Sequence, residues 1–222
     1  MGLKLVSFLL LPFLRRVSSF PSFSHPQGSA ASIVSSWDAG LSAGDLRPLI
    51  EKTLEKTSSA AGDGDLSIFL KSSDHWSGLW QARIQHFEKM SWTGLKVNPY
   101  YEIADKAIVS HVFISVLGFS GWLSASGFMT PSTSVFDPVI NLQFNSFFVS
   151  FGDNNLPRAE PSPSSLIDKM ITKIGQLAFI PSFALFPVDY ANLKTGMVAF
   201  RFTPFDSLIV AKRLPEGSKP SK

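Results

Sequence analysis

Few of the residues that could take part in catalysis or metal binding are spaced so that they could act together. The chain has four histidines, His25, His75, His86 and His111, and no two of them have the separation that a metal site requires. Cysteine is absent, which excludes disulfides, cysteine nucleophiles and cysteine metal sites. The sequence therefore predicts no metal site.

One acid–base pair is adjacent in sequence, Asp74 and His75, directly before Trp76. A carboxylate beside an imidazole is a combination used in general acid–base catalysis, but a loop cap accounts for the same pair. The sequence contains no G-x-S-x-G, P-loop or G-x-G-x-x-G motif. We therefore predict no catalytic residue, no cofactor and no enzymatic activity.

Composition narrows the class of protein. The 222 residues include 20 Lys and Arg against 17 Asp and Glu, a net charge of +3, which is too small for the basic surface of a nucleic-acid-binding protein. Hydrophobic residues make up 45% and charged residues 17%, below the roughly 25% typical of soluble domains. The 20 phenylalanines favour strands and apolar sites. These values predict one folded domain with a large apolar core.

Residues 1–37 differ from the rest of the chain, because the first acidic residue is Asp38. Residues 5–14 form a mostly apolar run that is too short to span a bilayer, which takes about 20 residues, but suits a signal-peptide core. The Ser-rich, acid-free residues 17–24 follow, as in an organelle transit peptide. Together they resemble the bipartite leaders of algae with complex plastids, with Phe20 as the first residue after the signal. We expect this leader to be removed and the protein to reside in a plastid; a secretory signal and mitochondrial targeting are the alternatives.

Two amphipathic helices are predicted in the body of the chain. We assign residues 38–215 to a single domain and residues 216–222 to a polar tail. The first helix covers residues 45–56, with Asp45 as its N-cap, and the second covers residues 165–177, after a proline-rich loop. Their apolar residues recur at helical spacing: Leu46, Leu49, Ile50 and Leu54 in the first helix, and Leu166, Met170, Ile174 and Leu177 in the second.

Elsewhere the hydrophobic period is two, which predicts strands. The clearest strand is 139–151, where the adjacent Phe147 and Phe148 indicate either a bulge or an end that is buried on both faces. Asn98 and Pro99 predict a turn. Further strands are predicted at residues 80–85, 101–103, 106–117, 122–128, 189–193, 197–203 and 208–211. Short strands at hairpin distance, with one helix before them and one inserted late, predict a mainly β fold: an antiparallel β-barrel that closes on itself and has room for one small ligand.

Residues 107–152 carry a single formal charge, Asp137. Such a segment consists of ordinary core strands, lines an apolar cavity, or touches lipid. A transmembrane helix at residues 107–123 is disfavoured, because the span lacks the roughly 18 consecutive apolar residues that are needed. If the barrel holds an apolar ligand, we expect the ligand-binding residues among the large side chains of this region: Phe113, Trp122, Leu142, Phe144 and Phe148.

A Gly-x-Trp triplet, Gly78 to Trp80, opens the β region. It is the short signature of lipocalin-like barrels, in which the Trp packs over the closed end of the barrel, often under a basic residue from the last strand. Arg213 stands in that place here and could form a cation–π contact. We predict that Gly78, Trp80 and Arg213 close the barrel.

The order of these features resembles the plastid-lipid-associated proteins, the PAP/fibrillin family. The matching stretches are residues 77–80, 188–193, 196–202 and 208–213. The sequence departs from the family where the usual Thr-Tyr-Leu-Asp becomes Val188 to Ala191, and where an Arg-x-x-Arg-Gly run is reduced to Arg201. The resemblance implies a lipocalin-like barrel in the plastid, at thylakoids or lipid globules, that binds or organises apolar lipids or pigments without catalysis.

Two functions therefore stay open. One is a non-enzymatic plastid protein that binds apolar lipid at a membrane or lipid-globule surface; the other is a subunit or assembly factor docked on a membrane protein complex. An internal cavity favours the first, and a solid core with a large exposed apolar patch favours the second. Residues 179–187 are apolar and broken by prolines, so we expect them to be irregular throughout. Membrane contact is expected there and near Lys169 and Lys173, through rings that could instead form a lid over the barrel: Phe179, Phe183 and Phe186.

Overall fold

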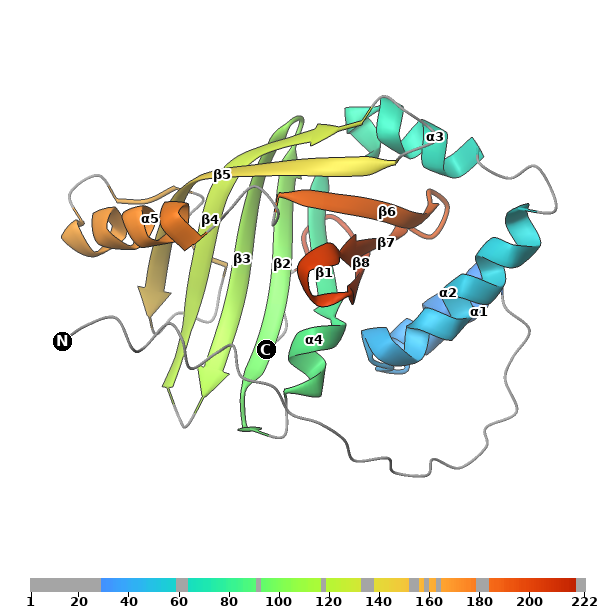
Figure 1. The fold of residues 1–222 in the computed structure, drawn as a ribbon, viewed down its shortest axis with the longest axis horizontal. Coiled ribbons are helices and arrows are strands. Elements are labelled where there is room, and N and C mark those ends of the chain that lie inside the picture. Colours follow the sequence, from blue (N-terminus) through green and yellow to red (C-terminus); the bar gives the residue numbers. More distant parts are fainter. Residues whose placement is uncertain are drawn as a thin grey trace.

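A ring of eight antiparallel strands forms the body of the protein (Figure 1). The computed structural model describes residues 29–58, 64–90, 93–116, 119–132, 138–151, 156–157, 160–162, 165–178 and 184–218. The strands are β1 (Gly78–Ile84), β2 (Lys96–Ala104), β3 (Ala107–Val116), β4 (Phe119–Pro131), β5 (Val139–Phe151), β6 (Leu185–Asn192), β7 (Met197–Phe202) and β8 (Ser207–Arg213). The predicted fold class, a mainly β protein with a lipocalin-like antiparallel barrel, is confirmed.

The ring is closed unevenly. Each strand pairs with its neighbour in sequence, and β1 pairs with β8 to complete the circle. The pairing between β5 and β6 covers only residues 139–141 and 185–187, whereas β4 and β5 pair along nearly their whole length. The rest of β5 therefore runs on beside β4, past the ring, as one edge of an extended sheet.

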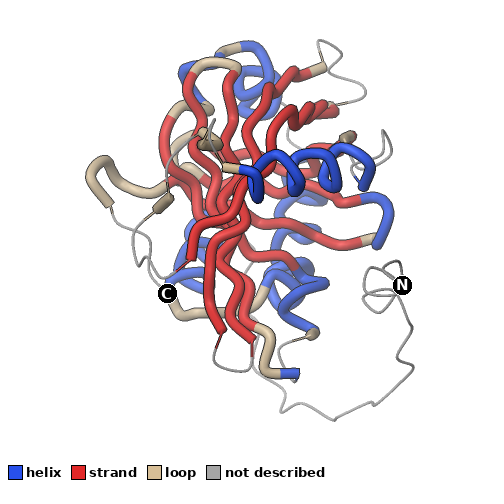
Figure 2. Tube along the Cα trace, turned by 90° about the vertical axis from the view of Figure 1, so that its left-hand side faces the viewer, coloured by secondary structure: helices blue, strands red, loops and turns tan. Residues whose placement is uncertain are grey.

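Five helices are described around these strands. They are α1 (Ala30–Asp38), α2 (Ala43–Ser58), α3 (Gly64–Lys71), α4 (Gln85–Lys89) and α5 (Leu166–Ala178). Figure 1 shows α1 and α2 at one end and α5 at the other, and α5 is therefore nearest the viewer in Figure 2. Of the helices described here, none combines the length and hydrophobicity that crossing a membrane would require.

The first predicted helix is confirmed as α2, which begins two residues earlier and ends two residues later. Its predicted stripe is buried against the outside of β7 and β8. The N-cap is Ser42 rather than Asp45: the Ser42 hydroxyl accepts from the Asp45 N–H at 3.1 Å, and the Asp45 carboxylate accepts from the Ser42 N–H at 3.3 Å. This reciprocal pair is a capping box, with the acid at the third helical position.

Helix α1 was not expected, because residues 30–37 were predicted to belong to the leader. Ile33 and Trp37 lie four residues apart on one helical face, and both are buried in the cluster that α2 shares with β7 and β8. The Arg83 guanidinium lies 4.0 Å from the centre of the Trp37 ring and donates to the Trp37 carbonyl at 3.0 Å. The folded domain therefore reaches back to Ser29. The predicted signal and transit segments, with Phe20, lie outside the described residues.

Three local predictions about the strands are wrong. Asn98 and Pro99 do not form a turn but lie inside β2, where Pro99 is opposite Val112 of β3. Pairing of β2 with β1 stops at Tyr100, so Pro99 stands at an edge, where a missing N–H is tolerated. The register shift in β5 falls between Phe144 and Ser146, so that Gly127 and Ser126 face these two residues and the bulge precedes the predicted position.

The third error concerns the segment 179–187, which was expected to be irregular throughout. Residues 185–187 form the start of β6 and pair with β5. The transmembrane alternative for residues 107–123 is also wrong, because that span holds β3 and the start of β4. Alternating side chains, rather than a continuous apolar surface, explain its mixture of β-branched and small residues.

Candidate functional site

The interior of the ring is an apolar chamber. Each of the eight strands contributes to its wall, as do α3 and the turn before β1. Most of the space is filled by side chains, and the cavity that is left has a volume of about 50 Å³. This leaves room for a slender apolar group rather than for a whole lipid.

Three aromatic residues pack against one another at one end of this cavity. The ring of Phe69, from α3, is stacked on Trp76 with centroids 4.8 Å apart and meets Trp80 edge-on at 6.4 Å. The Trp76 indole N–H donates to the Phe69 carbonyl, and the Trp80 indole N–H donates to the Trp76 carbonyl at 2.7 Å. Both indole donors are therefore engaged, which fixes these rings and satisfies their polar atoms away from water.

The three residues that were predicted to close the barrel, Gly78, Trp80 and Arg213, lie close to one another, but Arg213 lies against Gly78. Trp80 is buried and lies opposite Arg213 in the register of β1 and β8. Gly78 has a φ of +125°, which favours glycine, and a Cβ built there would lie 3.1 Å from Nε of Arg213. Arg213 thus lies against Gly78, while the cation–π contact seen among the described residues is that of Arg83 with Trp37.

A phenol is the polar group that the cavity wall offers. Tyr101 lines the cavity from β2, and burial raises the pKa of its hydroxyl to about 12. The group is therefore protonated at physiological pH and can donate a hydrogen bond. Among the described residues that line the cavity, none carries a carboxylate, amine or imidazole. The chamber can hold an apolar group and bond one polar atom.

The five predicted ligand-binding residues do not share one site. Leu142 lines the cavity, and Phe144 packs against the same interior cluster. Phe113 and Trp122 belong instead to a separate cluster, in which their rings are 5.1 Å apart. Phe148 is buried and does not line the cavity either.

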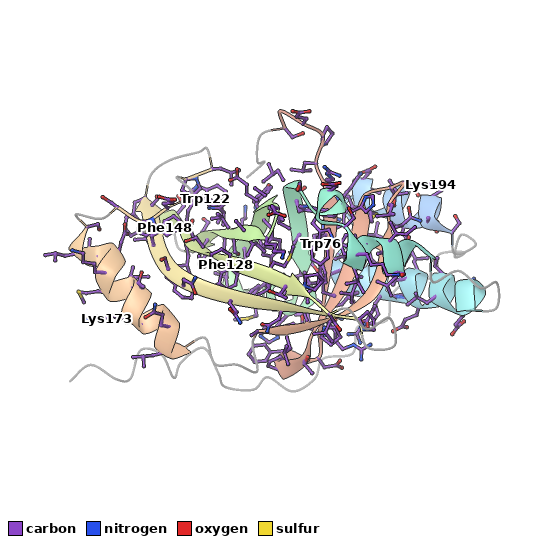
Figure 3. The ribbon with its side chains drawn as sticks, turned by 90° about the horizontal axis from the view of Figure 1, so that it is seen from above. Trp76, Trp122, Phe128, Phe148, Lys173 and Lys194 are labelled. Atoms are coloured by element: carbon purple, nitrogen blue, oxygen red, sulfur yellow. The ribbon has the colours of Figure 1, made fainter. Side chains whose placement is uncertain are left out.

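Strand alternation explains this separation. Ile108 points into the cavity from β3, so Phe113, five residues later, points to the opposite face of the sheet. Figure 3 shows Trp122 and Phe148 near each other at the α5 end, away from Trp76. If the inner face of β3 had been known, alternation from Ile108 would have placed Phe113 on the outer face from the sequence alone.

A buried histidine lies on the outer face beside that second cluster. His111 Nδ1 is 2.9 Å from the Ser124 hydroxyl, and its Nε2 is 3.8 Å from a Glu102 carboxylate oxygen and makes no hydrogen bond within the described part of the chain. Burial lowers the pKa of this imidazole to about 4, so the ring is neutral at physiological pH and the contact with Glu102 is no ion pair there. Its complete burial makes it part of the packing rather than a ligand-binding group.

The one sequence-adjacent acid–base pair lies outside the cavity. Asp74 and His75 form a 3-10 turn (Ser73–His75) between α3 and β1, and neither lines the chamber. His86 stacks on Phe205 with centroids 4.7 Å apart. Among the residues that the structure describes, no three His, Asp or Glu side chains gather as a metal site would require.

Helix α5 faces the opposite way from an ordinary surface helix. Its predicted apolar stripe is exposed to solvent, with Leu177 at 81% and Ile174 at 54%. Its polar residues instead face β5: the Thr172 hydroxyl accepts from the Phe147 N–H at 3.0 Å and donates to the Phe147 carbonyl at 2.8 Å. The amide of Gln176 donates to the Asn145 carbonyl at 2.8 Å. The helix therefore covers the edge of β5 that lacks a neighbouring strand in the described residues.

The predicted membrane-contact rings are only partly described. Phe179 and Phe183 lie outside the described residues. Phe186 lies in β6, lines the cavity and stacks on Phe202 at 5.6 Å, which places its ring in the barrel interior. The strand places it inside because it pairs with Ile140, whose side chain also points inward.

These features define a closed antiparallel barrel, lipocalin-like in shape, with an apolar interior, aromatic rings packed at one end and an amphipathic helix outside its extended edge. No protein-family model matches the sequence, and comparison with curated proteins finds no match.

Proposed function

We propose that this protein is a non-enzymatic lipid-associated protein of the plastid, which takes an apolar group into its barrel at a thylakoid or lipid-globule surface. The observation that carries the proposal is the lining of the cavity: apolar side chains from every strand and a single protonated phenol. Burying one methylene group from water contributes about 0.8 kcal/mol, so an acyl-chain end of a few carbons gains useful affinity there.

Tyr101 can bond to the polar end of the ligand. An ester carbonyl or a hydroxyl group near the chain could accept a hydrogen bond from Tyr101, whose side chain lines the cavity. The features of the leader and the resemblance to the PAP/fibrillin family support a plastid location and a lipid or pigment as ligand.

Titration with a fluorescent fatty acid tests the proposal. Ala211 lines the cavity and is buried, so Ala211→Leu fills the space that the ligand would take. Ala104 is exposed on β2, so Ala104→Leu is the matched control. We expect the first variant to bind at least tenfold more weakly than the parent and the control to bind like the parent, with thermal unfolding showing that both are folded. Equal binding by all three proteins would exclude the cavity as the site.

The second candidate is a subunit docked on a membrane protein complex. The exposed apolar residues of α5 are the feature that favours it. It predicts that the partner is a protein, and the experiments on α5 below separate it from a lipid partner.

A further inference from the structure

We propose that α5 is a docking helix that lies flat on an anionic lipid surface, with its apolar face inserted among the lipid chains. This inference deepens the proposed function by naming the element that meets the membrane, and it does not depend on a ligand in the cavity. Five large apolar side chains of α5 are more than half exposed: Leu166, Ile167, Met170, Ile174 and Leu177.

The opposite, polar face of α5 bonds to β5, and these bonds keep the apolar face exposed. Residues Asp168, Thr172 and Gln176 follow one another at intervals of four, which places them on one side of the helix. Thr172 and Gln176 bond to backbone atoms of β5, and the Asp168 carboxylate accepts from the Ser162 N–H at 2.8 Å. Turning the apolar face toward β5 would break these bonds and leave β5 backbone groups unsatisfied.

Packing against β5 fixes the same orientation. Gly175 lies directly over the Phe147 ring, and a Cβ built there would overlap the ring. Only the smallest residue lets the helix axis approach the strand so closely. The apolar stripe is therefore held outward by hydrogen bonds and by close contact, and it needs a partner from outside the described fold.

The charges of α5 indicate an anionic partner. Its exposed charged residues are Lys169 and Lys173, four residues apart on one edge of the apolar face, while its acid, Asp168, is buried. Figure 3 shows Lys173 on α5 at the outer limit of the molecule. Long lysine side chains at the edge of an apolar face can reach lipid phosphates while the helix lies at the depth of the headgroups.

The residue types favour lipid over a protein partner. Protein interfaces are enriched in Trp, Tyr and Arg and depleted in Lys, whereas the outer face of α5 consists of Leu, Ile and Met beside two lysines. Thirteen residues give a helix about 20 Å long, too short to span a bilayer but suited to lie in its surface.

The apolar surface continues from the helix onto the sheet. Phe147, Val149 and Phe151 alternate along β5 and so share one face, and Phe147 is the residue that α5 covers. Phe151 is 77% exposed, and Leu123 of β4, opposite Val149, is 38% exposed on the same face. An exposed aromatic ring beside an amphipathic helix adds apolar area that a flat lipid surface could cover.

Vesicle sedimentation tests the proposal with vesicles of phosphatidylcholine alone and of phosphatidylcholine with one quarter phosphatidylglycerol. The full chain is compared with the chain from Ser29, which contains every described element, so that binding by residues 1–28 is measured separately. The apolar variant is Met170→Gln with Ile174→Gln and Leu177→Gln, and its control is Ile68→Gln, exposed on α3. The charge variant is Lys169→Glu with Lys173→Glu, and its control is Lys89→Glu with Lys194→Glu, also exposed.

We expect the parent to bind anionic vesicles and the apolar variant to bind them at least tenfold more weakly with an unchanged melting temperature. Removing one lysine charge near an anionic surface costs roughly fivefold in affinity, so the charge variant should lose at least twentyfold on anionic vesicles. Both controls should bind like the parent. The Ala211→Leu variant should also bind vesicles like the parent, so a failed cavity and a failed docking helix give different results.

Three outcomes would overturn the proposal. The parent could fail to bind either vesicle, the apolar variant could bind as tightly as the parent, or its melting temperature could fall sharply, which would show that the α5 face is buried. Binding to protein-containing membranes that is lost after protease treatment, without binding to lipid vesicles, would assign the face to a protein. A dimeric parent with a monomeric apolar variant, and no vesicle binding, would assign it to a second copy of the chain.

Discussion

Acid should weaken the fold through one buried imidazole. His111 is neutral in the folded protein because burial lowers its pKa to about 4, whereas in the unfolded chain it has the ordinary value near 6.5. Between these two values the unfolded state binds a proton that the folded state does not. Stability is therefore fully present above about pH 6.5, falls as the pH drops toward 4, and falls no further from this cause below it.

The size of the effect follows from the difference between the two pKa values. A difference of about 2.5 pKa units corresponds to about 3 kcal/mol of unfolding free energy lost between pH 7 and pH 4.

Urea unfolding at pH 7 and pH 4 measures this loss, with His111→Gln as the control. Glutamine keeps a polar group within reach of Ser124 and cannot gain the proton. Other titrating groups act equally in both proteins, so the difference between them isolates His111. If parent and variant lose the same stability over this range, the imidazole is not held neutral by burial.

Three further predictions concern the closed end, the α5 contact and the start of the domain. Trp80→Ala should lower the unfolding free energy by about 3–5 kcal/mol, because it removes a large buried ring; an unchanged melting temperature would show the ring to be exposed. Gly175→Ala should destabilise α5 and speed hydrogen exchange of the Phe147 N–H, although alanine is worth about 1 kcal/mol more than glycine in a free helix; net stabilisation would contradict the close contact. N-terminal sequencing of the mature protein should begin at or before Ser29, because Ile33 and Trp37 are buried; a start at Asp38 would show that α1 is dispensable.

Most of the architecture could be predicted from the sequence, because strands and turns leave local signals. Alternating residues identify β5 at its observed bounds, and Gly196 marks the end of the turn between β6 and β7. Helix α1 was missed because its two buried residues, Ile33 and Trp37, stand in a Ser-rich, acid-free stretch that favours a targeting segment. The leader itself stays a prediction for residues 1–28.

The site was less predictable, because the direction of a side chain depends on partners far away in sequence. Phe113 and Leu142 both belong to apolar strands, and only the register of the closed ring shows which one faces the cavity. The stripe of α5 is typical of a helix that packs through its apolar face. Thr172 bonds to the edge of β5 that has no neighbouring strand in the described part of the chain, which turns the apolar stripe outward, and no local rule contains that information.

The central claim, that the barrel takes up the apolar end of a lipid or pigment, is tested most directly by native mass spectrometry of the processed protein purified under non-denaturing conditions. We predict that the parent carries an apolar lipid or pigment that is released by organic solvent, and that Ala211→Leu, purified in the same way, carries little or none. A parent that is folded yet shows only the mass of the bare chain, or a bound molecule retained equally by Ala211→Leu, would contradict the account.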